Sequence, residues 1–209
     1  TLVAGVYGDT LDGKGGADSL VGGDGSDLIY YHGNESVDGG SGSGGVDTLL
    51  VTTADATATV SIGGTTIQNI EVVTLAKDAT AAIVASGAAA LTINGNAGAT
   101  SIAGSAVADV IYGGGGADSI AAGAGDDFVE ITNNFSAGVA NGGAGSDTLS
   151  FGAANDSITF SDAAGNLTIA SKVGKTVDTL SGISNFEVYT GGAGNDTLDA
   201  ASVTGGISL

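Results

Sequence analysis

The sequence predicts an all-β protein, a right-handed parallel β-roll or β-helix in which short strands wind into a flattened solenoid. Three observations predict this fold: a nine-residue repeat, a larger repeat of about 100 residues, and a shortage of large side chains. The chain of 209 residues has 39 Gly, five Tyr and five Phe, and it lacks Pro, Cys, Met and Trp. Its apolar residues are mostly Ala, Val, Leu and Ile, which suit a thin core.

The charge of the chain is strongly one-sided. Its 23 acidic residues against four Lys and Arg give a net charge of −19. Such a chain repels nucleic acid and anionic lipid and attracts cations, which argues against a phosphate-binding role. Disordered acidic chains lack the evenly spaced Val, Ile, Leu and Thr found here. No apolar run approaches the roughly 18 residues of a membrane span. The absence of Cys fits an exported protein, and we expect the chain to be a fragment of a longer one.

The nine-residue unit has six Gly-rich residues, with Asp at the sixth place, followed by three residues of β character with an aliphatic at the eighth. Tandem copies occupy 4–30 and 104–130, and single copies occupy 42–50, 142–150 and 191–199. We therefore predict a coil of two such units, in which Gly permits the turns and the aliphatic side chains point inward. The predicted core comprises Leu11, Leu20, Ile29, Ile111, Ile120 and Val129.

The larger repeat divides the chain into two solenoid units, 1–100 and 101–209, within one continuous elongated domain. Four aspartates of the first unit recur 100 residues later in the second. These pairs are Asp9 and Asp109, Asp18 and Asp118, Asp27 and Asp127, and Asp47 and Asp147.

The 18-residue coil predicts a ladder of stacked carboxylates on one edge of each unit. Asp27 follows Asp9 by 18 residues, and Asp47 follows Asp27 by 20. The two extra residues predict a longer turn on the far edge, at 30–36 in the first unit and 131–138 in the second. The second ladder is Asp109, Asp127 and Asp147, whereas Asp18 and Asp118 are predicted on the opposite edge.

A bare carboxylate ladder opposes folding, because two charges 4 Å apart repel by about 4 kcal/mol at a surface-like dielectric. A hard cation between them reverses the sign. Ca²⁺ accepts 6–8 oxygen ligands, including carbonyls of Gly-rich turns, in irregular geometry. Mg²⁺ requires stricter octahedral geometry, and Zn²⁺ favours Cys and His, of which the chain has none and one. The ladders therefore indicate calcium.

The nonads resemble the G-G-x-G-x-D-x-U-x repeat of the RTX calcium-binding family, in which U is aliphatic. In that family an ion lies between turns 18 residues apart. The first turn contributes the carbonyls of its second and fourth residues, the other turn those of its first and third, and both contribute Asp. The resemblance implies one site from Gly5, Tyr7 and Asp9 with Gly22, Asp24 and Asp27, and another from Ser105, Val107 and Asp109 with Ala122, Ala124 and Asp127.

The same pattern implies further ligands at the equivalent turn positions. They are Gly23, Gly25, Gly113, Gly115, Gly123, Gly125, Gly142 and Ala144, with Asp196 in the last nonad. Tyr7 and Val107 replace glycines, so their turns are expected to differ. Thr100 lacks a carboxylate, which predicts a weak or empty site beside Asp118. We expect roughly four to six calcium ions.

The segments between the nonad blocks resemble the β-helical stretches of calcium-dependent bacterial surface-layer proteins, on the phrases 69–72 and 185–188 (NIEV and NFEV). The resemblance implies a non-enzymatic structural protein that passes through a type I secretion channel, folds on extracellular calcium and self-associates into a lattice or longer solenoid at the cell surface. Two alternatives stay open: an extender or ligand-binding module of an RTX adhesin, and an accessory domain of a secreted RTX enzyme.

Five residues outside the predicted ladders are of types that often bind metals, substrates or sugars. Glu71 and Glu187 are expected to face solvent or cap a coil rather than bind metal. His32 has no catalytic motif around it, and we interpret it as an ordinary loop residue. Tyr30 and Tyr112 each end a nonad and are expected on the outer face, where stacking on a cell-surface polysaccharide stays open.

Overall fold

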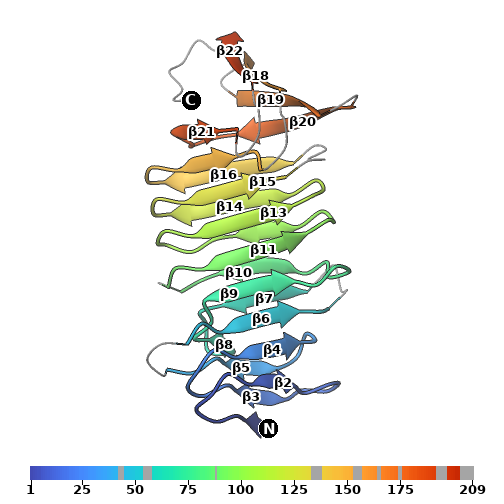
Figure 1. The fold of residues 1–209 in the computed structure, drawn as a ribbon, viewed down its shortest axis with the longest axis vertical. Helices are drawn as coiled ribbons and strands as arrows, with labels where there is room; N and C mark the ends of the chain where they lie inside the picture. Colours follow the sequence, from blue (N-terminus) through green and yellow to red (C-terminus); the bar gives the residue numbers. More distant parts are fainter. Residues whose placement is uncertain are drawn as a thin grey trace.

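In a computed structural model of the chain, short strands stack into an elongated column from the N-terminal to the C-terminal end (Figure 1). The predicted all-β solenoid is confirmed. None of the described residues forms a helix that could cross a membrane. The structure describes residues 1–41, 45–53, 58–87, 89–132, 138–152, 157–163, 166–173, 176–191 and 197–202.

One face of the column is a nine-stranded sheet in which all the strands are parallel. Each of its strands follows a Gly-rich or shortened turn and contributes three to five residues. In order, the strands are β2 (Thr10–Asp12), β4 (Leu28–Tyr31), β6 (Thr48–Val51), β9 (Val72–Leu75), β11 (Thr92–Asn96), β13 (Val110–Gly114), β15 (Phe128–Ile131), β17 (Thr148–Ser150) and β21 (Val188–Thr190).

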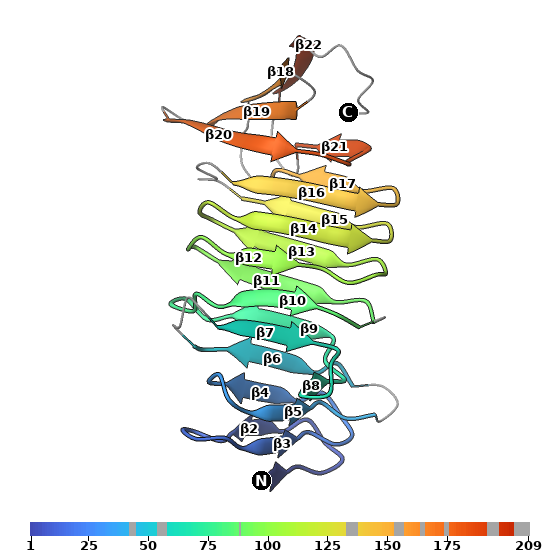
Figure 2. The same cartoon turned by 180° about the vertical axis from the view of Figure 1, so that it is seen from behind.

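The opposite face is divided into two parallel sheets (Figure 2). The first comprises β1 (Leu2–Val3), β3 (Ser19–Val21), β5 (Ser36–Asp38) and β8 (Ile67–Gln68). The second comprises β7 (Thr59–Ile62), β10 (Ala82–Ala85), β12 (Ser101–Ala103), β14 (Ser119–Ala124) and β16 (Val139–Ala144). The break falls within one coil, where β8 pairs with the preceding coil and β7 with the following one.

The core is a thin column of aliphatic side chains held in register by the strand pairing. Leu11 lies opposite Ile29, Ile29 opposite Leu49 and Ile111 opposite Val129. All six predicted core residues are at most 3% exposed. No coil buries its own apolar face, so each coil is stabilised by its neighbours.

The extra residues of the third coil lie in different turns in the two units. In the second unit Ser119 pairs with Val139, so the far turn is longer, as predicted. In the first unit Ser19 pairs with Ser36, and the prediction of a longer far turn at 30–36 is wrong. That turn is tight because Glu35 accepts hydrogen bonds from the backbone N–H groups of His32, Gly33 and Asn34, at 2.9–3.0 Å. The extra residues lie instead between β5 and β6.

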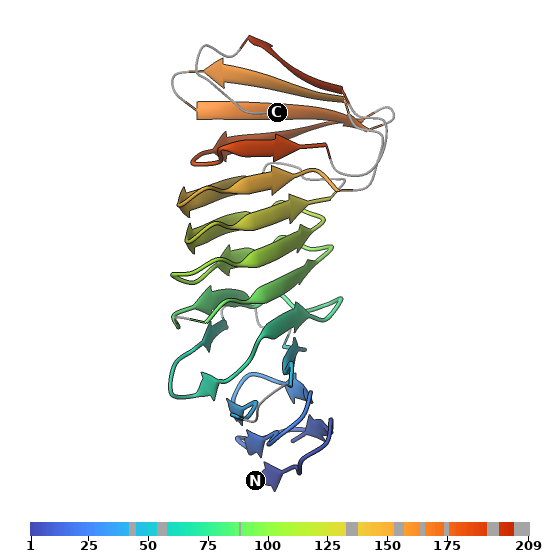
Figure 3. The ribbon, with the colours of Figure 1, turned by 60° about the vertical axis from the view of Figure 1, so that its left-hand side comes forward.

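The segment after β17 departs from the parallel winding expected for it. Strands β18 (Ser157–Ala163), β19 (Asn166–Val173) and β20 (Thr176–Ile183) form an antiparallel meander, and β22 (Thr197–Ser202) pairs parallel to β18 (Figure 3). Strand β21 then rejoins the nine-stranded sheet beside β17. The nine-stranded sheet therefore continues directly from β17 to β21, and β18, β19 and β22 lie beyond β21 at the C-terminal end of the column (Figure 3).

Candidate calcium-binding edge

The predicted ladder aspartates come immediately before strands of the nine-stranded sheet and form a continuous series of hydrogen bonds. The Oδ1 atom of Asp27 accepts the backbone N–H of Asp9 at 2.7 Å, and that of Asp47 accepts the N–H of Asp27 at 2.8 Å. The second unit repeats this arrangement at 2.8 Å at both steps. We call this series the aspartate edge: Asp9, Asp27, Asp47, Asp109, Asp127 and Asp147.

Two glutamates end these ladders. Glu71 Oε2 accepts the N–H of Asp47 at 2.8 Å, and Glu187 Oε2 accepts the N–H of Asp147 at 2.7 Å. Both residues therefore cap a coil, one of the two roles expected for them. Leu91 separates the ladders, since its N–H donates to Asp109 Oδ1 but it carries no carboxylate.

The second carboxylate oxygen of several ladder aspartates has no protein partner. Asp27, Asp127 and Asp147 are at most 2% exposed, and their Oδ2 atoms are buried without a hydrogen bond. A buried carboxylate oxygen without a donor is strongly unfavourable unless a cation or another group meets it. These atoms therefore fit a bound cation.

The glycine at the second place of the turn explains the missing donor. In the first turn of each unit, Gly5 N–H and Ser105 N–H donate to Asp9 Oδ2 and Asp109 Oδ2. Gly23 instead has φ +101° and donates to the carbonyl of Gly39 in the next coil. Only glycine adopts such a φ easily. The turn thereby withdraws its own amide from the aspartate.

Backbone carbonyls of the adjacent coil approach the same space. A methyl group placed on Gly22 would lie under 3.0 Å from both Asp27 Oδ2 and the carbonyl oxygen of Gly39. One placed on Gly104 would also lie under 3.0 Å from both Asp109 Oδ2 and the carbonyl oxygen of Ala122. Hence a carboxylate oxygen and a carbonyl oxygen from successive coils converge at the start of each turn, as an oxygen-seeking cation requires.

Several other carbonyl groups predicted as calcium ligands lie against the turn of the following coil. The nearest glycines of that turn leave no room for a side chain. The carbonyls of Gly5, Ser105, Gly123 and Gly125 lie under 3.0 Å from a methyl group placed on Gly23, Gly123, Gly143 and Gly145, respectively. Among the remaining predicted ligands, Asp24 N–H and Ala124 N–H donate to the carbonyls of Gly5 and Ser105, and the Ala144 carbonyl accepts from Gly125.

Tyr7 and Val107 differ from the glycines that occupy the fourth place elsewhere. Gly25 and Gly125 have φ of +109° and +120°, whereas neither Tyr7 nor Val107 has positive φ. The first turn of each unit is therefore shaped differently, as their side chains predicted.

Within the described residues, no three Asp, Glu or His side chains converge on one point. A cation at the aspartate edge would therefore take only one or two carboxylates and complete its shell from backbone carbonyls and water. Ca²⁺ tolerates such a mixed shell, whereas Zn²⁺ requires nitrogen or sulfur ligands.

The electrostatics of the aspartate edge also favour a cation. Burial, together with the smaller effect of the charges of Asp147 and Asp109, raises the pKa of Asp127 to about 6 against the opposing hydrogen bond from the Asp109 backbone N–H. Burial likewise raises the pKa values of Asp47 and Asp147. The negative charges of Glu71 and Glu187, respectively, raise them as well. At neutral pH these carboxylates carry a desolvation cost that a bound cation would offset.

The acidic residues on the opposite edge of the column do not form a ladder of three. We call it the far edge: Asp18, Glu35 and Asp118. Asp118 Oδ1 accepts the N–H of Thr100 at 2.9 Å, and the strand pairing places Gly138 after it, so neither adjacent coil adds a carboxylate. Burial raises the pKa of Asp118 to about 6.

The predicted far-edge ligands also lack the converging carbonyl. Gly13 and Gly113 hold the same place in their turns as Gly22. A methyl group on either would lie near Asp18 Oδ2 or Asp118 Oδ2, but no carbonyl oxygen of another coil would come within 3.0 Å of it. The amide of Gly115 donates to the carbonyl of Asn96. The far edge thus lacks the converging carbonyls of the aspartate edge, and its one buried carboxylate oxygen without a hydrogen-bond partner among the described residues is Glu35 Oε1. Asp196 lies outside the described residues.

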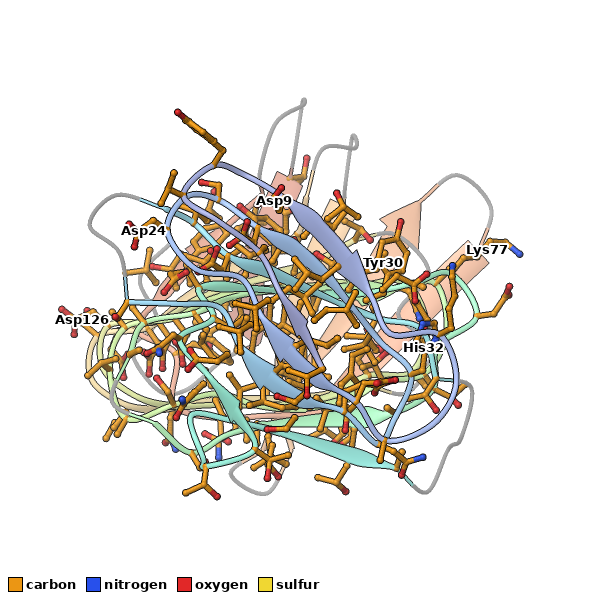
Figure 4. The ribbon with its side chains drawn as sticks, turned by 90° about the horizontal axis from the view of Figure 1, so that it is seen from below. Asp9, Asp24, Tyr30, His32, Lys77 and Asp126 are labelled. Carbon is orange, nitrogen blue, oxygen red and sulfur yellow. The ribbon has the colours of Figure 1, made fainter. Side chains whose placement is uncertain are left out.

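His32 lies on the other side of the column from Asp24 and Asp126 (Figure 4). Its Nε2 is 2.9 Å from Asp12 Oδ1, and its Nδ1 is 2.8 Å from Thr52 Oγ1. The Thr52 hydroxyl donates its proton to the carbonyl of Tyr31. Because the Thr52 hydroxyl already donates its proton to the backbone, His32 does not activate that hydroxyl as a nucleophile. The hydrogen bonds of His32 instead link three successive coils.

Comparison with known proteins agrees with this arrangement. The RTX calcium-binding nonapeptide repeat family matches four copies, at residues 3–33, 94–129, 139–158 and 178–202, which together cover more than half of the chain. No curated protein and no solved structure gives a match. The RTX nonapeptide repeats bind calcium, and the aspartate edge supplies oxygens suited to it. The chain therefore belongs to the RTX calcium-binding nonapeptide repeat family and is a β-solenoid of that family.

Proposed function

We propose that the chain is a structural segment of an extracellular bacterial surface-layer protein, which folds and assembles when calcium occupies the aspartate edge. The observation that carries this proposal is the set of buried, unpartnered Oδ2 atoms of Asp27, Asp127 and Asp147. They make the folded state costly without a cation and stable with one. Calcium would therefore act as a component of the core rather than as a substrate.

Folding would follow the calcium concentration around the protein. Inside a cell calcium is scarce, so the 23 acidic residues against four basic ones would keep the chain extended for type I secretion. Outside, an ion that binds only the folded state stabilises it by about 2.7 kcal/mol per site at 100 times its dissociation constant. Roughly four to six ions would add enough stability to make folding strongly favourable.

Self-association would use the flat sides of the column. On the outer face of the nine-stranded sheet, Tyr112 packs edge-on against Phe128 of the next coil, and Tyr112 and Val188 are 37% and 38% exposed. Such a surface can pack against another copy or against a cell-surface polysaccharide, where exposed tyrosines favour stacking on sugar rings.

Calcium-dependent assembly of the purified chain tests this proposal. Light scattering and electron microscopy would follow the protein as calcium rises from EGTA conditions to millimolar levels. We expect extended assemblies that dissolve again on chelation. Discrete, folded monomers at millimolar calcium would contradict the surface-layer role and favour an adhesin segment or an accessory domain. The calcium-dependent fold would then stand without the lattice.

A further inference from the structure

We infer that the two Asn-x-Glu turns, Asn69–Glu71 and Asn185–Glu187, each complete an additional calcium site at the end of a ladder. This inference rests on the proposed calcium-stabilised fold, and it assigns ligands outside the nonads. The structure places the two turns in the same position in the two units. Each follows the last nonad turn of its ladder and precedes a strand of the nine-stranded sheet.

The oxygens at these turns repeat those between two nonad turns. A methyl group on Gly142 would lie under 3.0 Å from both Asp147 Oδ2 and the carbonyl of Asn185. A methyl group on Gly39 would likewise lie under 3.0 Å from both Asp47 Oδ2 and the carbonyl oxygen of Asn69. Because one point lies so near both oxygens, a single Ca²⁺ with bonds of about 2.4 Å can bridge them.

The asparagines orient these carbonyls. Asn69 and Asn185 have φ of +53° and +55°, and besides Lys14 they are the only described non-glycine residues with positive φ. Asparagine tolerates this left-handed conformation better than most residues. The conformation is therefore part of the turn in both units, and it directs the carbonyl toward the preceding coil.

Glutamate takes the place of the ladder aspartate in a shortened turn. One residue lies between Asn185 and Glu187, whereas four lie between Gly142 and Asp147. The longer side chain still reaches the N–H of Asp147. Within the described part of the chain the Glu187 carboxylate accepts no other hydrogen bond, so its second oxygen can bind a cation.

A buried, unpartnered oxygen distinguishes this site from a surface cluster of acidic residues. Asp147 is fully buried, and its Oδ2 has no hydrogen-bond partner. On the other ladder, Asp47 is 5% exposed, so its carboxylate is also largely withdrawn from solvent. Because the shortened turn lacks a third-residue carbonyl, water must complete the shell, and these two sites should bind calcium more weakly than those between nonad turns.

Calcium counting with charge-neutral variants tests the inference. The double variant Glu71→Gln, Glu187→Gln keeps an acceptor oxygen for each aspartate N–H but removes the charge. Isothermal titration calorimetry and equilibrium dialysis should show two fewer calcium ions than in the wild-type chain. Circular dichroism at saturating calcium should stay unchanged. Glu130→Gln is the matched control, since Glu130 lies on β15 away from the ladders, and it should bind the wild-type number.

Other outcomes separate this inference from the proposed function. If the double variant binds the wild-type number of ions with unchanged affinities, the glutamates only accept hydrogen bonds and the inference is wrong. If the wild-type chain itself binds no calcium, the proposed function fails. Should the double variant not fold, each single variant is measured, and each is expected to lose one ion.

Discussion

Replacing Asp127 by asparagine should change stability in opposite directions with and without calcium. Asparagine keeps an Oδ1 acceptor for the Asp109 N–H, a hydrogen bond of 2.8 Å, but it cannot ionise. Burial raises the pKa of Asp127 to about 6 from 3.8. A shift of about two units corresponds to a folded-state cost of roughly 3 kcal/mol for the charge at neutral pH. Without calcium, Asp127→Asn should therefore be more stable than wild type by up to about 3 kcal/mol.

With calcium the same variant should be less stable. Asp127 lies between Asp109 and Asp147 in the ladder, so its carboxylate would contribute to ions on both sides. Loss of one site at 100 times its dissociation constant removes about 2.7 kcal/mol, and loss of two removes about twice as much. The free energy of unfolding should thus fall by about 3–5 kcal/mol in millimolar calcium.

Urea denaturation followed by far-UV circular dichroism measures both effects. The EGTA series would include an osmolyte such as TMAO if the wild-type chain needs one to fold. Asp126→Asn is the control, because Asp126 carries the same charge next in sequence but is exposed. It should change stability little under either condition. An Asp127→Asn variant that shifts stability in the same direction under both conditions would refute the account of a buried, cation-matched carboxylate.

Three further predictions follow from the same structure. Gly22→Ala should lower the free energy of unfolding by about 1–3 kcal/mol, because its methyl group would clash with Asp27 Oδ2 and the Gly39 carbonyl. Isothermal titration calorimetry should also count fewer bound calcium ions. Gly15→Ala is the neutral control, since a methyl group on Gly15 would have nothing within 4 Å. Asp118→Asn should keep the calcium number, and it should reduce the fall in stability that the wild type shows as pH rises from about 4 to 6. The folded-state pKa of about 6 for Asp118 exceeds 3.8, so the folded state holds this proton more tightly than the unfolded one, and Asp127 still contributes its own part of the fall. Thermal denaturation across that range measures the difference, and loss of an ion in this variant would show that Asp118 is a ligand. Ile93→Ala, in the middle of the core column, should lower stability by about 2–5 kcal/mol in urea.

The strand positions and the ladder could be predicted because the nonad encodes them locally. Each unit pairs a Gly-rich turn with one inward aliphatic, so residues such as Leu11 and Ile29 must stack once the coil length is 18. The aspartate edge follows from the same arithmetic. These features depend on spacing alone, which the sequence displays.

The turn lengths and the inserted meander could not be predicted in the same way. The separation of Asp27 and Asp47 shows two extra residues but not the turn that holds them, and the tight far turn depends on the hydrogen bonds that Glu35 accepts. The strands 157–183 are as rich in Thr, Val and Ile as parallel coils are. Their antiparallel direction is set by tertiary pairing, which composition does not reveal.

The nonad spacing does not predict that Glu71 and Glu187 end the ladders, but the sequence contains a signal for it. Asn-x-Glu-Val occurs at 69–72 and 185–188, and each valine begins a strand of the nine-stranded sheet. The ladder aspartates stand at the same place, immediately before such a strand. An alignment of the strands, rather than of the nonads, therefore places Glu71 and Glu187 in the ladders.

The central claim is that the cation completes the core of this solenoid, and a calcium titration of the chain tests it most directly. Far-UV circular dichroism would be recorded in EGTA and then at rising calcium, with magnesium at equal concentration as the control. We expect a coil spectrum in EGTA that becomes a β spectrum with calcium and stays a coil spectrum with magnesium. A β spectrum that is the same in EGTA and in calcium would contradict the central claim.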